Sequence, residues 1–468
     1  MKKLWVVLLS LGLVMAFSMS AFAVSADFTG QYYLRQNYTS NPSLMDQDKG
    51  AGRGPAAFTD QRLRLFTRLK VVEGVTLTTR MDLLESVWGK EQAMMPPSGL
   101  PATPSSKQMR DFNIGNVSVE QLYLNFNTAI GTFIVGNKSG TPFQWGTWFL
   151  NNSGTAAGIY WTKTFGNYTV IADLAKTSKG DMATVAASGE IVKTQGLATD
   201  RDRDYYDLAV QYKGKDLEGG LMFSYFRFAS GRTAAGGSLD TALFLNPYAK
   251  AKFGPVDLEF EGYYTPYGKR QYDNPTTNQD QNYKAKGFYV QGKYNMGPAW
   301  AGAAYVYASG ADTTATAAKG DDITGTVLSQ FGYGTDNYSG LWSNYTPNIL
   351  MGYASDSYHS FIGNAAGPAT GQTTDNLKLL NLIAGVAVGK TLNFDGKLSF
   401  AKLDKAPTGW DDSLGTELDL RGTYKIYDCL SYGVGFAYLW TGDYFKAGVA
   451  ATPTANNYYV THWLDLRF

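Results

Sequence analysis

The chain has 468 residues, of which 14% are aromatic and only 17% are charged, with 52 glycines but 16 prolines. This charged fraction lies well below the roughly 25% of a soluble domain and suits a sheet with one face in lipid. The charges of the 41 basic and 40 acidic residues nearly cancel, so the net charge indicates no nucleic-acid partner. The chain has a single cysteine, Cys429, which excludes an intrachain disulfide and argues against attached haem, structural zinc or another cofactor.

The first segment has the three parts of a cleavable signal peptide. Lys2 and Lys3 precede an apolar run over residues 4–17, and small residues follow up to Ala23. The run is shorter than the roughly 20 apolar residues that a membrane-spanning helix needs. We therefore expect removal of residues 1–23 on export, or of residues 1–26 if the cut follows Ala26.

Beyond this leader, apolar and polar residues alternate with a period of two, and the connections alternate between very short and long. Outer-membrane barrels have this asymmetry because short turns face the periplasm and long loops face outward. The predicted strands are 27–38, 58–72, 75–88, 117–128, 132–138, 156–165, 168–177, 203–213, 218–229, 239–253, 256–266, 282–295, 299–308, 376–389, 392–402, 414–426, 430–440 and 457–468. The predicted fold is all-β: one antiparallel transmembrane β-barrel over residues 27–468 with about eighteen strands, and sixteen to twenty also fit the pattern.

The connection over about residues 309–375 is far longer than the others and shows no sustained alternation. Long connections of this kind are usually functional or mobile. Two interpretations stay open. The segment either folds into the lumen or over its mouth as a constriction or lid, or it is a mobile external loop.

The final predicted strand ends in a pattern of its own. Leu464, Leu466 and Phe468 alternate with polar or bulkier residues, so the apolar face closes on an aromatic carboxy-terminus. Such an ending resembles the signature by which the barrel assembly machinery recognises outer-membrane proteins. The expected surroundings are outer-membrane lipid and lipopolysaccharide.

If the apolar alternate residues face lipid, the other set faces the interior. On the early strands the expected pore-lining residues are mostly basic: Arg35, Arg62, Arg64, Arg68, Lys70, Arg80, Asp82 and Lys138. On later strands they are mostly acidic: Asp257, Glu259, Glu261, Glu417, Asp419 and Arg421. A lumen bearing both signs can filter anions. Equally, interior networks of opposite charges can simply hold a barrel in shape, and a sugar-stacking track of Tyr33, Tyr123 and Tyr289 is a further alternative.

Two segments near the carboxy-terminus carry a family resemblance: Gly415-Thr416-Glu417-Leu418-Asp419-Leu420 and Thr441-Gly442-Asp443-Tyr444-Phe445-Lys446. They are similar to the G-T-E-x-D-L and G-D-Y-x-K motifs of the alginate-export-like family of outer-membrane porins. A weaker match lies at Val135-Gly136-Asn137-Lys138, where that family tends to have Gly-Arg-Gln. The resemblance covers about the last 60 residues, and it implies a large monomeric barrel with an arginine-rich lumen that passes anionic polyuronate.

The expected function is passive diffusion of small hydrophilic solutes, anions among them, through an aqueous lumen. The alternative is a structural or partner-bound barrel without an open pore of its own. An enzyme is disfavoured because it needs a positioned nucleophile and base, whereas the two histidines are His359 in the long connection and His462 on the lipid face. Uptake through a plugged barrel is disfavoured because the first strand directly follows the leader, and no metal site is expected without a His/Cys cluster.

Overall fold

The computed structural model describes residues 24–41, 44, 55–88, 117–140, 143–150, 155–179, 184–185, 191–192, 202–229, 232, 237–274, 278–310, 376–446 and 453–468. Residues 1–23 of the predicted leader lie outside the described residues, and so does the long connection apart from residues 309–310. Both predictions therefore stay predictions. Within the described part of the chain, no helix is long and apolar enough to cross a membrane.

Eighteen strands form one closed antiparallel barrel, in which each strand pairs with its neighbours along the chain and the last strand pairs with the first. Their bounds are β1 (Ser25–Thr39), β2 (Ala56–Val72), β3 (Val75–Val87), β4 (Val117–Thr128), β5 (Gly131–Ser139), β6 (Thr155–Phe165), β7 (Tyr168–Lys179), β10 (Asp202–Lys213), β11 (Leu217–Phe228), β12 (Ser238–Phe253), β13 (Val256–Tyr272), β15 (Lys286–Met296), β16 (Ala299–Ala308), β17 (Leu377–Val388), β18 (Leu392–Lys402), β19 (Ser413–Tyr427), β20 (Leu430–Thr441) and β21 (Asn457–Arg467). Short pairings add β14 (Gln281–Asn282) on β13 and a separate pair of β8 (Thr184–Val185) and β9 (Ile191–Val192). The predicted fold class and all eighteen predicted strands are confirmed.

The largest shift from the predicted boundaries is at β13, which continues six residues beyond Pro266. A proline lacks the N–H that a strand ladder needs, so sequence reasoning ends the strand there. The β12–β13 register shifts near this point, because Leu243 pairs with Tyr267 and Leu245 pairs with Tyr264. A bulge leaves a residue out of the ladder, and Pro266 is accommodated in this irregularity.

Alternation in the sequence becomes alternation between the two faces of the wall. On β10, Leu208 and Val210 are exposed on the outer face while Asp207 and Ala209 are buried on the inner face. Exposed aromatic residues gather near both ends of the outer face: Phe165, Tyr168, Phe253 and Tyr427 at the turn end, and Tyr206, Tyr225, Tyr264 and Tyr267 toward the other end. An apolar band between two aromatic girdles is the outer surface of a membrane barrel.

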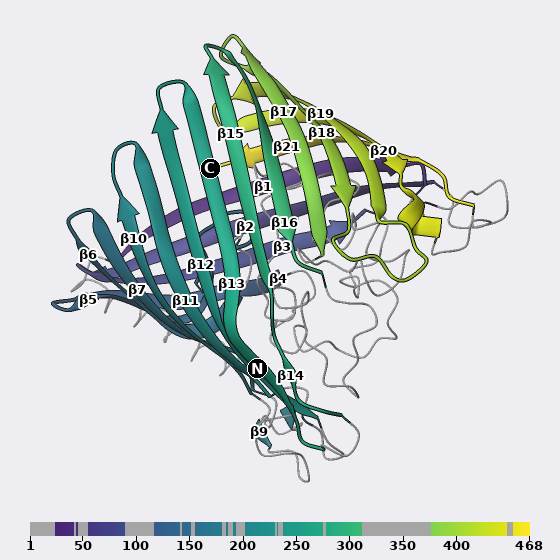
Figure 1. Ribbon diagram of the computed structural model, residues 1–468. Helices are drawn as coiled ribbons and strands as arrows, with labels where there is room; N and C mark the ends of the chain where they lie inside the picture. Colours follow the sequence, from purple (N-terminus) through teal and green to yellow (C-terminus); the bar gives the residue numbers. More distant parts are fainter. Residues whose placement is uncertain are drawn as a thin grey trace, which may run out of the picture.

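Eight tight turns join consecutive strands at one end of the barrel (Figure 1). Gly74 and Gly254 sit in two of them with φ of 79° and 58°. Glycine has no Cβ and therefore adopts this left-handed conformation with little strain. This allows the hairpins to turn within two residues.

The barrel closes along the β1–β21 seam, where the purple first strand and the yellow last strand lie side by side (Figure 1). At the turn end, the Gly30 amide donates to the Phe468 carbonyl at 2.7 Å and the Phe468 amide donates back at 3.1 Å. At the other end, the buried Asn457 side-chain oxygen accepts from the Thr39 and Ser40 hydroxyls and the Asn41 amide. The closed seam leaves the sheet no free edge.

Candidate functional site

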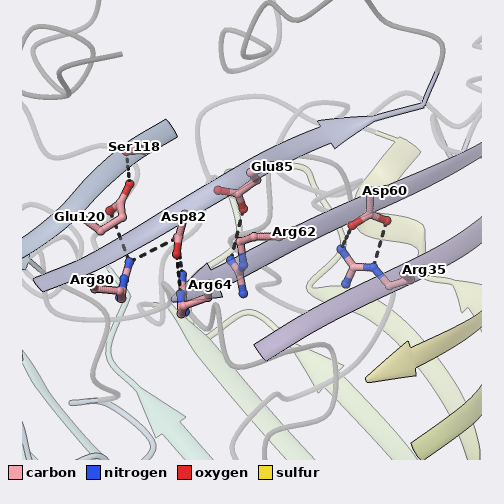
Figure 2. A network of polar contacts seen from close by, with 9 residues as sticks. All are labelled: Arg35, Asp60, Arg62, Arg64, Arg80, Asp82, Glu85, Ser118 and Glu120. Atoms are coloured by element: carbon pink, nitrogen blue, oxygen red, sulfur yellow. Dashed lines mark hydrogen bonds and ion pairs between the residues drawn. The ribbon is translucent and has the colours of Figure 1, made fainter. Parts of the chain in front are cut away.

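Opposite charges line the inner face of β1–β4. Arg35 comes from β1, Arg62 and Arg64 from β2, and Arg80 from β3 (Figure 2). Because successive residues of a strand face opposite sides, the alternating positions 62 and 64 project inward together. We call the whole set the paired-charge wall; it comprises Arg35, Asp60, Arg62, Arg64, Arg80, Asp82, Glu85 and Glu120.

Each arginine of this wall contacts a carboxylate. Arg35 donates two hydrogen bonds to Asp60, of 3.1 and 2.6 Å. Arg64 likewise donates two hydrogen bonds to Asp82, of 2.8 and 2.6 Å. The Arg62 guanidinium donates to Glu85 at 3.2 Å. The bidentate Arg35–Asp60 and Arg64–Asp82 pairs fix the orientation of their guanidinium groups (Figure 2).

Asp82 is shared between two arginines. Besides the Arg64 fork, its carboxylate lies 3.6 Å from Arg80 Nη2, which in turn donates to Glu120 at 3.3 Å. The chain of contacts ends at Ser118, whose hydroxyl donates to Glu120 at 2.7 Å (Figure 2). The basic wall expected from the sequence is therefore a ladder of alternating charges.

The two remaining basic residues of β2 lie near the turn. Arg68 and Lys70 are exposed, and the Lys70 ammonium is 3.9 Å from the Asp27 carboxylate. An exposed pair at this distance contributes little binding or stability. Lys138 lies apart from the ladder on β5, where its ammonium donates to the Ser139 carbonyl at 2.8 Å and sits 5.0 Å from the Tyr160 ring centroid.

The predicted acidic residues divide into two groups on different strands. On β13, Asp257 accepts from Asn295 at 2.8 Å and Glu259 faces Lys250 at 3.7 Å, both near the turn end. On β19, Glu417 and Asp419 are buried, and Arg421 donates to Asp395 at 2.8 Å. Asp419 stands directly across from Lys397 in the β18–β19 register, so this group also mixes both signs.

Residues 143–150, between β5 and β6, fold inside the barrel, and we call them the inward segment. The Phe143 amide donates to Asp207 on β10 at 3.0 Å, and the Trp145 indole donates to the Asn246 carbonyl on β12 at 3.2 Å. Trp148 stacks on Tyr289 of β15, with ring centroids 5.3 Å apart. β10 is only two strands from β6 around the ring, but β12 and β15 are four and six strands away, so the segment crosses the interior to reach them.

Glu261 is the principal anchor of the inward segment. Its fully buried carboxylate accepts the main-chain amides of Phe149 at 2.6 Å and Leu150 at 3.1 Å, and the Asn246 side-chain amide at 3.2 Å. A carboxylate that replaces water with several N–H donors is stabilised where it is buried. Glu261 was expected to line a pore, and the structure brings it together with a segment that sequence reasoning missed.

The signal for the inward segment was present in its composition. The stretch Phe143-Gln144-Trp145-Gly146-Thr147-Trp148-Phe149-Leu150 holds five large apolar residues in a connection between strands. An external loop leaves such side chains in water, so this composition favours burial. Tyr289, expected as part of a sugar track, is 1% exposed under Trp148 and offers no face to a solute.

Both described ends of the long connection are held by residues 404–405. The Gly310 amide donates to the Asp404 carboxylate at 3.0 Å, and the Asn376 side chain exchanges two hydrogen bonds with the Lys405 main chain. Lys378 also contacts Asp404 at 2.9 Å. The entry and the exit of the connection are thereby tied to one point on the rim.

This clamp is expected to depend on pH only in acid. Burial works to raise the pKa of the Asp404 carboxyl, but the Gly310 amide and the Lys378 ammonium outweigh it and hold that pKa below its ordinary value of 3.8. A depressed pKa means that the stabilisation is complete above 3.8 and is lost as the pH falls through the folded-state value. Hydrogen-exchange protection of the Gly310 and Lys405 amides should therefore stay constant from neutral pH to about pH 5.

Replacing Asp404 by asparagine should lower that protection at neutral pH, because the charge that holds Lys378 is gone. Asp411→Asn is the matched control. Asp411 lies with Asp404 in the connection between β18 and β19, but its carboxylate accepts from the nearby Ser413 amide. Equal protection in both variants would contradict the clamp.

The interior thus combines a fixed ladder of charges on one side with a folded segment anchored on the other. Among the described residues, no group of three or more His, Cys, Asp or Glu side chains could hold a metal ion. What the arrangement can do is narrow an aqueous passage and place fixed charges along it.

A closed barrel with an apolar outer band, two aromatic girdles and a charged, narrowed interior defines an outer-membrane channel for passive diffusion of small hydrophilic solutes. A family model described as Gram-negative porin matches residues 10–341, more than half of the chain, and the chain belongs to that family. The family places it in the outer membrane, surrounded by lipid and lipopolysaccharide. A search of curated protein sequences gives no match.

Solved structures share the fold at low sequence identity. OccK9 (OpdG) of Pseudomonas aeruginosa is 13% identical with a TM-score of 0.52, over 94% of this chain and 99% of that one. A BenF-like porin from Pseudomonas fluorescens Pf-5 is 11% identical with a TM-score of 0.51, over 94% and 99%. Pseudomonas aeruginosa OpdK with vanillate is 9% identical with a TM-score of 0.50, over 94% and 98%.

The resemblance to the alginate-export-like family is wrong, because the model that matches the chain is that of the Gram-negative porin family. The residues that carried it have local structural roles. Gly415 has a φ of 124° at the start of β19, and a short 3-10 helix, η4 (Asp443–Lys446), buries Tyr444 and Phe445.

Proposed function

We propose that the solute path runs between the paired-charge wall and the inward segment and that it prefers small anions modestly over small cations. The strand order supports this path, because β1–β4 lie across the ring from β12, β13 and β15, which the segment contacts. The pore-lining role of the predicted residues is part of the proposal. So is a transport role without a catalytic reaction.

The observation that carries the preference is the sharing of Asp82 between Arg64 and Arg80. Arg80 also contacts Glu120, so the four arginines of the wall face four carboxylates, but each guanidinium has five N–H donors. The wall therefore has no net charge, and the preference comes from its many guanidinium N–H donors, which favour anions in a narrow passage. Assembly by the barrel assembly machinery, with the β21 ending as its signal, belongs to the same proposal.

The test is single-channel recording of the refolded protein in planar bilayers under a salt gradient. The expected result is a steady open current with a reversal potential on the anion side. A reversal potential on the cation side would overturn the preference, and a correctly folded barrel that carries no current would overturn the proposed path.

A further inference from the structure

Three lysines project from the outer face of the barrel at the end opposite the tight turns, and we call them the lysine patch. Lys286 is the first residue of β15, Lys378 is the second residue of β17 and Lys402 is the last residue of β18. Each lies two residues from an exposed apolar residue of the outer face: Phe288, Leu380 and Phe400. Because side chains of a strand alternate between the two faces, the three lysines lie on the membrane side of the wall.

The lysine patch lies at the level of the outer-leaflet headgroups. The short turns of an outer-membrane barrel face the periplasm, so the opposite end, which carries the patch, faces outward. Beside the patch, the Phe288 ring contacts Tyr305 and Tyr307 of β16, with ring centroids 5.9 and 5.8 Å away. Aromatic rings on the outer face mark the boundary between hydrocarbon and headgroups. Lysines at this boundary extend their ammonium groups into the headgroup layer.

Two lysines of the patch are neighbours of like charge. Lys378 and Lys402 stand directly opposite each other in the β17–β18 register. Like charges at such positions repel each other and destabilise the strand pair. One carboxylate offsets each ammonium, since Asp404 lies 2.9 Å from Lys378 and Asp412 lies 3.2 Å from Lys402. An ammonium has three N–H donors, so both lysines retain donors for a further anion.

Positive charge is in excess around the patch. Lys286 is exposed and forms no ion pair within the part of the chain that the structure describes. The described charged residues on the outer face and rim at this end of β15–β19 are Lys284, Lys286, Lys378, Lys402 and Lys405, against Asp404, Asp411 and Asp412. Five ammonium groups thus face three carboxylates, and Asp280, which precedes β15, is already paired with Lys269 at 2.9 Å. The patch therefore attracts anionic headgroups.

We propose that the lysine patch binds the phosphate groups of lipid A, the phosphorylated glycolipid of the outer leaflet. A phosphate between Lys378 and Lys402 accepts charge-assisted hydrogen bonds from both and relieves their repulsion. Lys286, two strands away, contacts a second phosphate, and the exposed apolar residues beside the patch contact acyl chains. The site lies on the outer face and does not depend on the proposed solute path.

The experiment measures the unfolding temperature of the refolded protein in neutral detergent micelles while lipid A is added. A lipid that binds the folded barrel raises this temperature in a concentration-dependent way. Lipid A with both phosphates is expected to do so, and dephosphorylated lipid A should have no more effect than phosphatidylethanolamine. Lys286→Gln and Lys402→Gln should each weaken the apparent affinity for phosphorylated lipid A about fivefold, as expected for one lysine beside an anionic headgroup.

Lys390→Gln is the matched control. Lys390 lies in the turn between the same two strands, β17 and β18, but at the opposite end of the barrel. The substitution removes the same charge away from the patch, so the affinity for lipid A should equal that of the unmodified protein. Inorganic phosphate, which has no acyl chains, should displace little of the bound lipid.

Equal stabilisation by phosphorylated and dephosphorylated lipid A would overturn phosphate recognition. An equal loss of affinity in Lys390→Gln and Lys402→Gln would overturn the lysine patch as its site, and displacement of the lipid by inorganic phosphate at the same concentration would overturn lipid A as the ligand. None of these outcomes alters the expected single-channel current, so the proposed solute path would stand or fall separately.

Discussion

Replacing Glu261 by alanine is expected to turn a steady single-channel current into a noisy one with a higher mean conductance. The carboxylate holds the inward segment through the amides of Phe149 and Leu150. Each hydrogen bond to a charged group contributes about 1.5–3 kcal/mol, so losing both lets the segment leave the wall for much of the time. The measurement is the distribution of current levels in planar bilayers.

Glu259→Ala is the matched control for this result. Glu259 is the next inner-face residue on the same strand, and its ion pair is with Lys250 on neighbouring β12. The Glu259→Ala substitution also removes one negative charge but leaves the Glu261 anchor in place, so the current should stay steady. Identical noise in both variants would show that charge loss, and not release of the segment, causes it.

Replacing Asp82 by asparagine should strengthen anion preference more than any other single substitution in the paired-charge wall. The change leaves Arg64 and Arg80 without the carboxylate that both contact. A unit charge about 4 Å from a passing ion changes its energy by about 1 kcal/mol even at the dielectric constant of water. The anion-to-cation permeability ratio should therefore rise about fivefold, and reversal potentials measure it directly.

Asp257→Asn tests whether the position of the charge matters. It removes one inner-face carboxylate near the Gly254 turn, away from the wall. The expected rise in anion preference is small, because ions at a wide mouth are screened by salt and water. An equal rise in both variants would place the selective section outside the paired-charge wall.

The barrel could be predicted from the sequence because its physical cause is local. Each strand carries its own two-residue alternation, and turns such as Glu73-Gly74 mark the hairpins, so no knowledge of distant contacts is needed. The boundary error at Pro266 arose because the bulge that accommodates it depends on the register of β12, which a single strand does not reveal.

The interior was predictable only in part. Alternation placed Arg62, Arg64, Arg80 and Asp82 on one face, but the cross-strand pairs that balance their charges depend on register. The anchoring of Phe149 and Leu150 to Glu261 joins residues more than 110 positions apart, and no local pattern encodes it. The apolar composition of residues 143–150 indicates burial, yet the sequence does not say against which wall.

The closing seam also constrains how the protein is made. Gln31 on β1 donates to Asp465 on β21, a contact between residues 434 positions apart. A nascent chain carries an unpaired β1 edge throughout its synthesis, and such edges invite aggregation. Closure of the barrel must therefore wait until residues 457–467 have been made, and a chain that stops before them is left with two open strand edges.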